Sequence, residues 1–154
     1  MPERIAGRSI DSTIQAAEAR VRVRYAETDQ MGVVYYANYL IWMEIGRVEL
    51  LRQAGLDYKS MEVEDDCHIP VVEATCRYKA PARYDDEIVV ETKAAVLRGY
   101  ILKFNYRIVR ADDGKLLAEG ETAHVVTDRK MQRKLLPEKY IAALGQAGKS
   151  ENGC

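Results

Sequence analysis

One acidic side chain stands just before a turn and a long apolar segment. Asp29 lies in the stretch TDQMGVVYYANYL (residues 28–40), and Gly32 follows three residues later. An aspartate near a glycine most often serves a turn, because its short carboxylate accepts hydrogen bonds from the backbone that follows. The second interpretation is chemical. A carboxylate that is ionised at neutral pH can attack a carbonyl carbon or take a proton from water.

The start of the segment after Asp29 could supply the complementary group. The first N–H groups of a helix have no partner within the helix, and they carry the positive end of its dipole. Such groups bind anions and stabilise an oxyanion that develops during acyl transfer. A carboxylate and an N–H donor that face one position are a minimal set for that reaction. The spacing alone leaves both interpretations of Asp29 open.

A strand and a helix must hold these groups in place. From Ala19 the sequence ARVRVRYA alternates apolar and basic residues, which is typical of a half-buried strand. A helix is predicted from about Ala37 to Ala54, with Gly55 at the left-handed position after it. Apolar residues cover nearly the whole circumference of this helix, which predicts burial on most sides. They are Leu40, Ile41, Trp42, Met43, Ile45, Val48, Leu50 and Leu51.

The rest of the chain is rich in predicted strands. A short helical or irregular stretch at 57–66 precedes strands at 69–79, 86–97, 100–110 and 115–127, in antiparallel succession. Asp113-Gly114 in ADDGK is predicted to form a hairpin turn with a pair of positive φ angles. Pro137 opens a short helix that ends near Leu144. One helix in the curve of one antiparallel sheet is an α+β architecture.

We expect one domain at residues 19–145, between an N-terminal arm at 1–18 and a flexible tail at 146–154. A sheet that covers one helix leaves its edges open, and pairing of those edges between two copies would close them.

The residues around Asp29 also resemble a known family. YAETDQMGVVYYANYL (25–40) closely resembles the signature of the 4-hydroxybenzoyl-CoA thioesterase family, and the similarity covers about residues 19–137. It continues at 42–44, Arg47, 50–52, 70–72, Tyr78 and 81–86. The resemblance implies a hotdog fold, in which about five antiparallel strands wrap a long helix, and acyl-CoA thioesterase activity. It implies that Asp29 is the catalytic carboxylate and that a backbone N–H near Tyr36 is the oxyanion donor.

The chain departs from the family pattern at two positions. Many bacterial relatives carry His at position 36, whereas Tyr36 matches the 4-hydroxybenzoyl enzymes. Glu27 replaces the first acid of the usual Asp-Thr-Asp. Tyr36 therefore leaves open whether its side chain or only its N–H contributes to the chemistry.

Further residues are expected to contact an acyl-CoA substrate. Gly32, Val33 and Tyr35 flank the turn, and Tyr35, Tyr36, Tyr39 and Trp42 either line an aromatic-tolerant pocket or belong to the core. Arg129 and Lys130, in the basic stretch DRKMQRK (128–134), are candidates to pair with the coenzyme A phosphates, as is Arg98. A solvated turn is the alternative for the basic stretch.

Other polar residues have plainer interpretations. Glu44 and Arg47 are spaced for an ion pair on the helix, at a dimer interface, or else for lining the pocket. His124 is expected to be a hydrogen-bonded core or interface histidine. Cys67-His68 lacks the spacing of a metal site, and three cysteines without a CxxC motif predict no disulfide framework.

Composition excludes several partners. A net charge of −1 gives no global field for nucleic acid, and the basic stretch has no stacking aromatic beside it. No apolar run reaches the roughly 20 residues of a membrane span, and the N-terminus has no signal-peptide pattern, so we expect a cytoplasmic protein. A thioester is already activated, so no metal or redox cofactor is expected; coenzyme A enters as part of the substrate. A homodimer or homotetramer is expected.

Two other functions stay open. A hotdog dehydratase acting on a 3-hydroxyacyl thioester needs a histidine base near the helix start, and residues 25–55 contain none. A non-catalytic acyl-thioester binding protein would keep the pocket without turnover.

Overall fold

An antiparallel sheet forms one layer of the protein. The computed structural model describes residues 8–9 and 16–149, with side chains described from 16 to 145. The strands are β1 (Arg8–Ser9), β2 (Ala17–Arg22), β3 (Val71–Tyr78), β4 (Glu87–Arg98), β5 (Ile101–Arg110) and β6 (Leu116–Val125). Their order in the sheet is β1-β4-β5-β6-β3, and β2 also pairs with β4. All of these pairings are antiparallel.

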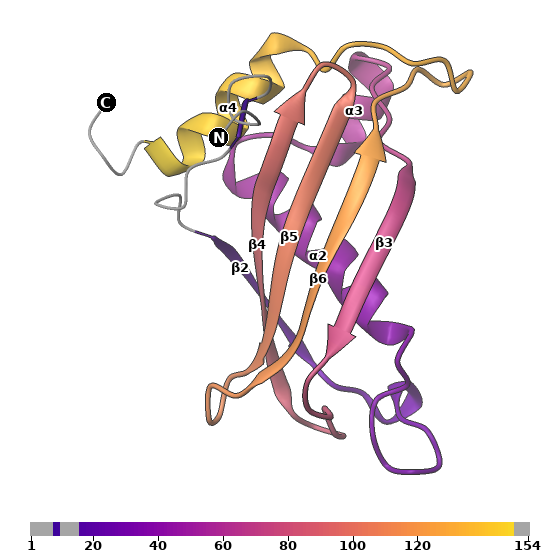
Figure 1. The fold of residues 1–154 in the computed structure, drawn as a ribbon, viewed down its shortest axis with the longest axis vertical. Helices are drawn as coiled ribbons and strands as arrows, with labels where there is room; N and C mark the ends of the chain where they lie inside the picture. Colours follow the sequence, from indigo (N-terminus) through magenta and orange to yellow (C-terminus); the bar gives the residue numbers. More distant parts are fainter. Residues whose placement is uncertain (1–7, 10–15, 150–154) are drawn as a thin grey trace.

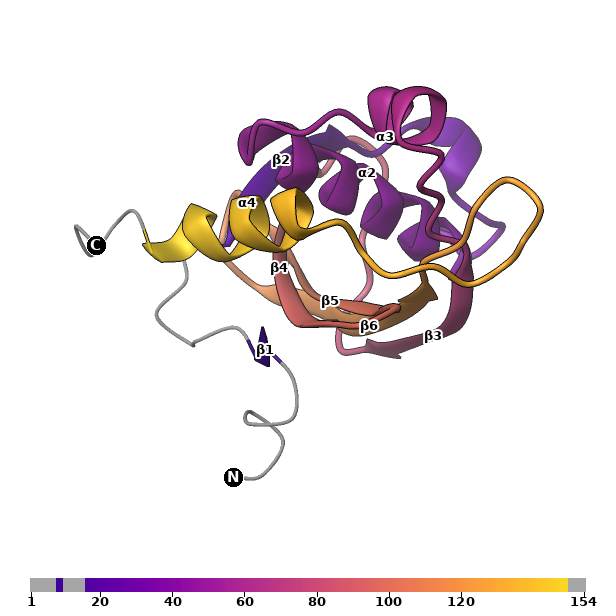
Figure 2. The ribbon, with the colours of Figure 1, turned by 90° about the horizontal axis from the view of Figure 1, so that it is seen from above.

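One long helix lies against this sheet. The helices are α2 (Asn38–Gln53), α3 (Tyr58–Glu64) and α4 (Glu138–Lys149), and a 3-10 turn, η1, spans Tyr25–Glu27. Figure 1 shows α2 crossing behind β4, β5, β6 and β3. From above, the sheet curves around one side of α2 and α3 lies on the other (Figure 2). This arrangement confirms the predicted α+β hotdog architecture.

The side-chain alternation of the strands builds the core between α2 and the sheet. On β5, Phe104 and Tyr106 point inward and are buried, whereas Asn105 and Arg107 are exposed. Trp42 and Met43 of α2 are fully buried. The helix lies very close to β4 at Gly46, where an added Cβ would stand 2.3 Å from Thr92 Oγ1. These contacts fix α2, and therefore its first turn, against the sheet.

The ends of the chain are more ordered than predicted. The strand expected from Ala19 begins at Ala17, and Arg8–Ser9 pairs with β4, so the predicted arm at 1–18 is wrong for these residues. Helix α4 continues to Lys149 instead of ending near Leu144. The rest of the arm and residues 150–154 of the tail lie outside the described residues, and the division into domains stays a prediction.

The hairpin between β5 and β6 differs from the predicted turn. Arg110 and Lys115 are joined by a backbone hydrogen bond, so the loop has four residues between them. Gly114 has φ of 71°, but Asp113 is not in the positive-φ region. Longer hairpin loops are most often built around a type I turn, which needs no pair of positive φ angles.

The order of the strands and the exposure of α2 also differ from the predictions. β3 does not pair with β4 but lies at the edge of the sheet beyond β6, because β2 occupies the position beside β4. The predicted burial of α2 on most sides is wrong for one face of a single chain. Leu40, Ile41 and Ile45 are 41%, 51% and 40% exposed. The curved sheet, β2 and α3 do not cover this face.

Among the residues the structure describes, no helix is both long and apolar enough to cross a membrane.

Candidate active site

Asp29 begins a tight turn and accepts hydrogen bonds within it. Its Oδ1 atom lies 2.9 Å from the Met31 amide nitrogen and 3.5 Å from that of Val33. The backbone closes the same turn: the Asp29 N–H donates to the Val33 carbonyl, and the Gly32 N–H donates to the Asp29 carbonyl. Gly32 has φ of 80°, which a residue without Cβ adopts at little cost. The turn uses Oδ1, and no hydrogen bond to Oδ2 exists among the described residues.

The start of α2 is not capped by a side chain. The residue before the helix, Ala37, offers none, and the N–H groups of Asn38, Tyr39 and Leu40 donate to carbonyls three residues earlier. The N–H groups of Tyr36 and Ala37, which come just before, have no hydrogen-bond acceptor in the described part of the chain. The unpaired donors therefore lie in the turn that leads into α2, at the residue where the sequence predicted an oxyanion donor.

Asp29 and Tyr36 line one open cavity. It has a volume of about 390 Å3 and is lined by Asp29, Val33, Val34, Tyr36, Tyr39, Tyr78, Lys79, Ala80 and Pro81. The loop before α2 and the segment after β3 form its walls. Backbone contacts join these two segments, because the Val34 N–H donates to the Ala82 carbonyl at 2.8 Å. The cavity therefore brings together a carboxylate with a free oxygen and an uncapped helix start.

Tyrosine rings form much of the cavity wall. The ring of Tyr78 packs edge-on against Tyr36 and Tyr39, with centroids 6.4 Å and 5.0 Å apart. The predicted contact residues divide between cavity and core: Val33 lines the cavity, whereas Trp42 is fully buried beneath it. Tyr35 is half exposed and packs on Tyr36 without lining the cavity. A hydrogen bond with the Tyr36 side chain raises the pKa of Tyr35.

A second acid in this region is structural, and the sequence analysis did not assign it a role. Glu27 is only 6% exposed, and its carboxylate accepts hydrogen bonds from the Arg24 backbone N–H at 2.8 Å and from the Trp42 indole at 3.4 Å. Its carbonyl accepts from the Tyr35 N–H and from the Asn38 side chain, both at 2.9 Å. Glu27 therefore holds the loop against the first turn of α2. The sequence signal for this role is an acid three residues after Arg24, a spacing at which the carboxylate can accept from the earlier backbone N–H.

The predicted phosphate-binding cations do not reach this cavity within one chain. The Arg129 N–H donates to Asp66, which precedes β3, whereas the cavity lies at the other end of β3, beside Tyr78. From the first to the last of its eight residues, β3 spans roughly 23 Å, because each step along a strand rises about 3.3 Å. Arg98, which ends β4, is paired with Ile101 at the same far end (Figure 1). Arg129 and Lys130 are exposed there.

The predicted ion pair between Glu44 and Arg47 is wrong. Glu44 is exposed, whereas Arg47 is 8% exposed and points its Nη1 at the Tyr106 hydroxyl, 3.4 Å away. Successive turns of a helix place residues three apart about 60° from each other around its axis. Here that difference separates the solvent side of α2 from the side that faces the sheet.

His124 is a satisfied core histidine, as predicted. Its Nδ1 lies 2.8 Å from the Ile69 carbonyl and its Nε2 lies 2.8 Å from Thr122 Oγ1. A carbonyl only accepts, so Nδ1 donates to Ile69 and Nε2 accepts from Thr122. Burial lowers the pKa of His124 to about 4, which keeps the ring neutral. It cannot serve as the base of the cavity beside Asp29.

His68 is paired with Asp66 at 3.1 Å, near the start of β3. Within residues 8–9 and 16–149, no group of three or more His, Cys, Asp or Glu side chains could hold a metal ion.

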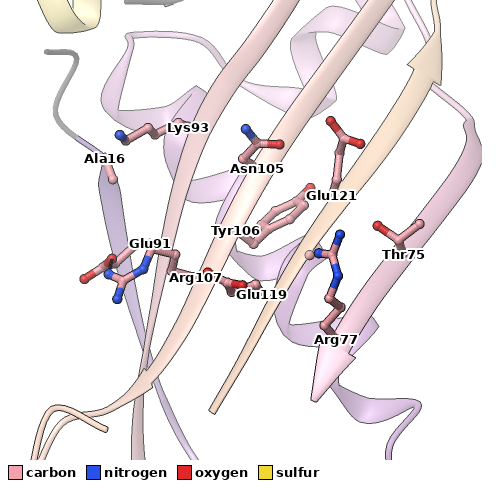
Figure 3. A pocket seen from close by; sticks show the side chains of 11 residues that line it. Ala16, Thr75, Arg77, Glu91, Lys93, Asn105, Tyr106, Arg107, Glu119 and Glu121 are labelled. Carbon is pink, nitrogen blue, oxygen red and sulfur yellow. Dashed lines mark hydrogen bonds and ion pairs between the residues drawn. The ribbon is translucent and has the colours of Figure 1, made fainter. Parts of the chain in front are cut away.

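A larger cavity on the outer face of the sheet has a different character. It has a volume of about 440 Å3 and is lined mainly by charged side chains of β3, β4, β5 and β6 (Figure 3). These charges alternate across the strands: Arg107 stands opposite both Glu91 and Glu119, and Glu119 stands opposite Arg77. Arg107 and Glu91 are 2.7 Å apart. Opposite charges in direct register stabilise a sheet, so this face needs no ligand to explain it.

The fold defines the class of protein, a hotdog-fold protein with an open cavity beside the start of its long helix. The chain belongs to the Thioesterase-like superfamily, which its sequence matches over residues 23–144. This result confirms the resemblance drawn from residues 25–40.

Individual relatives agree with this assignment. The chain is 38% identical over 127 residues to the acyl-CoA thioester hydrolase YbgC of Escherichia coli strain CFT073, covering 82% of this chain and 93% of that protein. Among solved structures, the hypothetical protein TT1821 of Thermus thermophilus has a TM-score of 0.79 and 40% identity, covering 85% of this chain and 98% of the other. The 1,4-dihydroxy-2-naphthoyl-CoA thioesterase Slr0204 of Synechocystis has a TM-score of 0.77 and 25% identity, covering 84% and 95%.

Proposed function

We propose that this chain hydrolyses acyl-CoA thioesters in the cavity beside Asp29, releasing a carboxylic acid and coenzyme A. The observation that carries the proposal is that Asp29 and the uncapped start of α2 line the same cavity. YbgC, which aligns with most of this chain, is an acyl-CoA thioester hydrolase, and this similarity supports the same reaction.

The Tyr36 N–H and the Asp29 carboxylate have different roles in the proposed reaction. The N–H of Tyr36 donates to the thioester oxygen and stabilises the negative charge that develops there in the transition state. Asp29 acts in one of two ways. As a nucleophile it bonds to the carbonyl carbon and expels the thiolate, and water then hydrolyses the resulting anhydride. As a general base it takes a proton from the water that attacks, and the thiolate leaves and is protonated. The thioester needs no added metal or redox group for either route.

A second copy of the chain would bring further cations to the coenzyme A end of the substrate. In the described sheet β3 pairs only with β6, so its other edge is open. Two identical strands that pair antiparallel about a twofold axis place the start of one beside the end of the other. The partner subunit's Arg129 and the partner subunit's Lys130 would then lie beside the cavity of the first chain. A homodimer through β3 therefore adds the partner subunit's Arg129 and the partner subunit's Lys130 to Lys79, the cation of the same chain that lines the cavity.

Two alternatives fit the residues less well. A dehydratase needs a histidine near the helix start, but His124 is buried and His68 lies at the far end of β3. A binding protein without turnover would need neither a free carboxylate oxygen nor an unpaired N–H in its cavity. Neither alternative explains why both groups meet there.

The test is a thiol-release assay with purified protein and a panel of acyl-CoAs: benzoyl, hydroxybenzoyl, acetyl, hexanoyl and palmitoyl. Release above the uncatalysed rate with at least one of them is expected. Binding of these compounds by calorimetry without any release would instead identify an acyl-thioester binding protein.

A further inference from the structure

We propose that Tyr78 is a positioning residue, whose phenol holds the turn that carries the oxyanion donor. The inference rests on the proposed function, because it concerns the same cavity. Tyr78 is the last residue of β3, and its hydroxyl donates to the Tyr36 backbone carbonyl at 3.0 Å. Tyr36 also carries the unpaired N–H at the start of α2. Tyr36 therefore lines the cavity and has an unpaired N–H, while its carbonyl is held by the last residue of β3.

The hydroxyl acts where the backbone alone holds Tyr36 weakly. Apart from the Tyr78 hydroxyl, the Tyr36 carbonyl accepts only the Tyr39 N–H, at 3.3 Å, which is long for such a bond. A carbonyl and an N–H of one residue are separated by two rotatable bonds, since the peptide units on either side are planar. Fixing the carbonyl from a second direction therefore restricts where the Tyr36 N–H can point. Catalysis depends on such donors being aimed before the reaction begins.

Two other hydrogen bonds join the same pair of segments. The Val34 N–H donates to the Ala82 carbonyl at 2.8 Å, and the Ala82 N–H donates to the Tyr39 hydroxyl at 3.3 Å. These bonds hold the loop and the segment after β3 together without Tyr78. Removal of the Tyr78 hydroxyl should therefore change the local orientation at Tyr36 and leave the fold in place.

The Tyr78 hydroxyl is suited to remain protonated and therefore to remain a hydrogen-bond donor. Partial burial raises the pKa of Tyr78 above the ordinary value of a tyrosine. The hydroxyl stays protonated across the pH range in which an enzyme of this class works. Its proton points at the Tyr36 carbonyl, so Tyr78 acts through Tyr36 and is not itself a catalytic residue.

The test replaces Tyr78 by phenylalanine, which removes the hydroxyl and keeps the ring between Tyr36 and Tyr39. We expect kcat to fall roughly tenfold, less than the loss from removing an oxyanion donor outright. KM should change less than about twofold, because the ring still lines the cavity, and Tm should change by no more than about 2 °C. The matched control is Tyr84→Phe, since Tyr84 is 58% exposed and makes no hydrogen bond through its hydroxyl in the described chain. Its kcat should equal that of the wild type.

Amide hydrogen exchange gives a second readout that does not depend on turnover. In Tyr78→Phe, exchange at Tyr39, whose N–H shares the Tyr36 carbonyl, should accelerate several-fold, and it should be unchanged in Tyr84→Phe. Wild-type kcat together with wild-type exchange in Tyr78→Phe would overturn the inference. A fall in kcat matched by a large fall in Tm would also overturn it, since that pattern marks a structural role. If the wild type hydrolyses no thioester, the proposed function fails, and the exchange measurement still decides whether Tyr78 holds Tyr36.

Discussion

Asp29 and Asp128 begin the same five-residue turn at opposite ends of the molecule. Oδ1 of Asp29 accepts from Met31 and Val33, and Oδ1 of Asp128 accepts from Lys130 and Gln132, at the same two spacings. Both turns are closed by the same pair of backbone bonds. The turn is therefore not what distinguishes Asp29. What distinguishes it is the start of α2 on the other side of its cavity.

Replacement of Glu27 by alanine should destabilise the protein. The carboxylate is buried, and its loss leaves the Trp42 indole N–H without an acceptor in the core. We expect the free energy of unfolding in urea to fall by roughly 2 kcal/mol, and less for Glu27→Gln, which keeps one acceptor. Arg20→Ala is the control, because the ion pair between Arg20 and Glu87 is exposed and should contribute less than about 1 kcal/mol. Equal effects of Glu27→Ala and Arg20→Ala would refute this role for Glu27.

Stability should fall on acidification because of His124. Its pKa is about 4 in the folded chain, through burial, and about 6.5 in an unfolded chain. The unfolded state therefore binds more protons between these values, and the free energy of unfolding decreases as pH falls from 6.5 to 4, by roughly 3 kcal/mol. Urea titrations of His124→Gln should lose this slope, whereas those of His68→Gln should keep it. If the wild type, His124→Gln and His68→Gln all show the same dependence of the free energy of unfolding on pH, groups other than His124 cause it.

Gly46 should not tolerate a side chain. A Cβ there would stand 2.3 Å from Thr92 Oγ1 and 2.7 Å from Val90 Cγ1, and β-branched side chains on a central strand cannot swing away. Gly46→Ala should lower the free energy of unfolding by about 1–3 kcal/mol. Gly145→Ala, where nothing lies within 4 Å, should raise it by about 0.5–1 kcal/mol, because alanine favours a helix. Thermal or urea unfolding of both variants checks the opposite signs.

The sequence predicted the bounds of the helices and strands better than it predicted which strands pair with each other. The alternation of apolar residues placed α2 and the long strands within about two residues of their observed bounds. Local patterns do not encode which strands pair, so the position of β3 beyond β6 could not be predicted. That position decides the site, because it puts Tyr78 beside Tyr36 and leaves an edge open for a second copy.

The candidate site was predictable only in part. Asp29 and Tyr36 were placed by family resemblance, and the structure brings both to one cavity. The turn at Asp29 was one of the two interpretations drawn from the sequence, and the structure confirms it. The holding of Tyr36 by Tyr78 was not accessible from the sequence, because it depends on hydrogen-bond geometry between distant segments. Arg129 was predicted from its charge alone, and charge does not reveal at which end of a strand a loop will lie.

The cations of one subunit should serve the cavity of the other. Arg129→Ala/Lys130→Ala should raise KM for acyl-CoA about tenfold or more, because coenzyme A phosphates lose their partners. KM for the matching N-acetylcysteamine thioester, which has no phosphate, should not change. An equal rise of KM for both substrates would exclude phosphate binding by these residues.

Mixing variants tests the arrangement between subunits. A dimer of an Asp29→Asn chain and an Arg129→Ala/Lys130→Ala chain contains one intact site if the cations act across the interface. Re-association of the two variants should therefore restore low-KM activity in the mixed dimers. No restoration would mean that these residues act within their own chain or not at all.

The most direct test of the central claim compares Asp29→Asn with Asp128→Asn in single-turnover hydrolysis of the best acyl-CoA. Both amides can keep the turn, since their oxygen still accepts the same backbone hydrogen bonds. Only Asp29 lines the cavity beside the helix start, so the rate should fall at least about 100-fold in Asp29→Asn and stay within twofold of wild type in Asp128→Asn. Wild-type rates in Asp29→Asn would contradict the assignment of the reaction to this cavity.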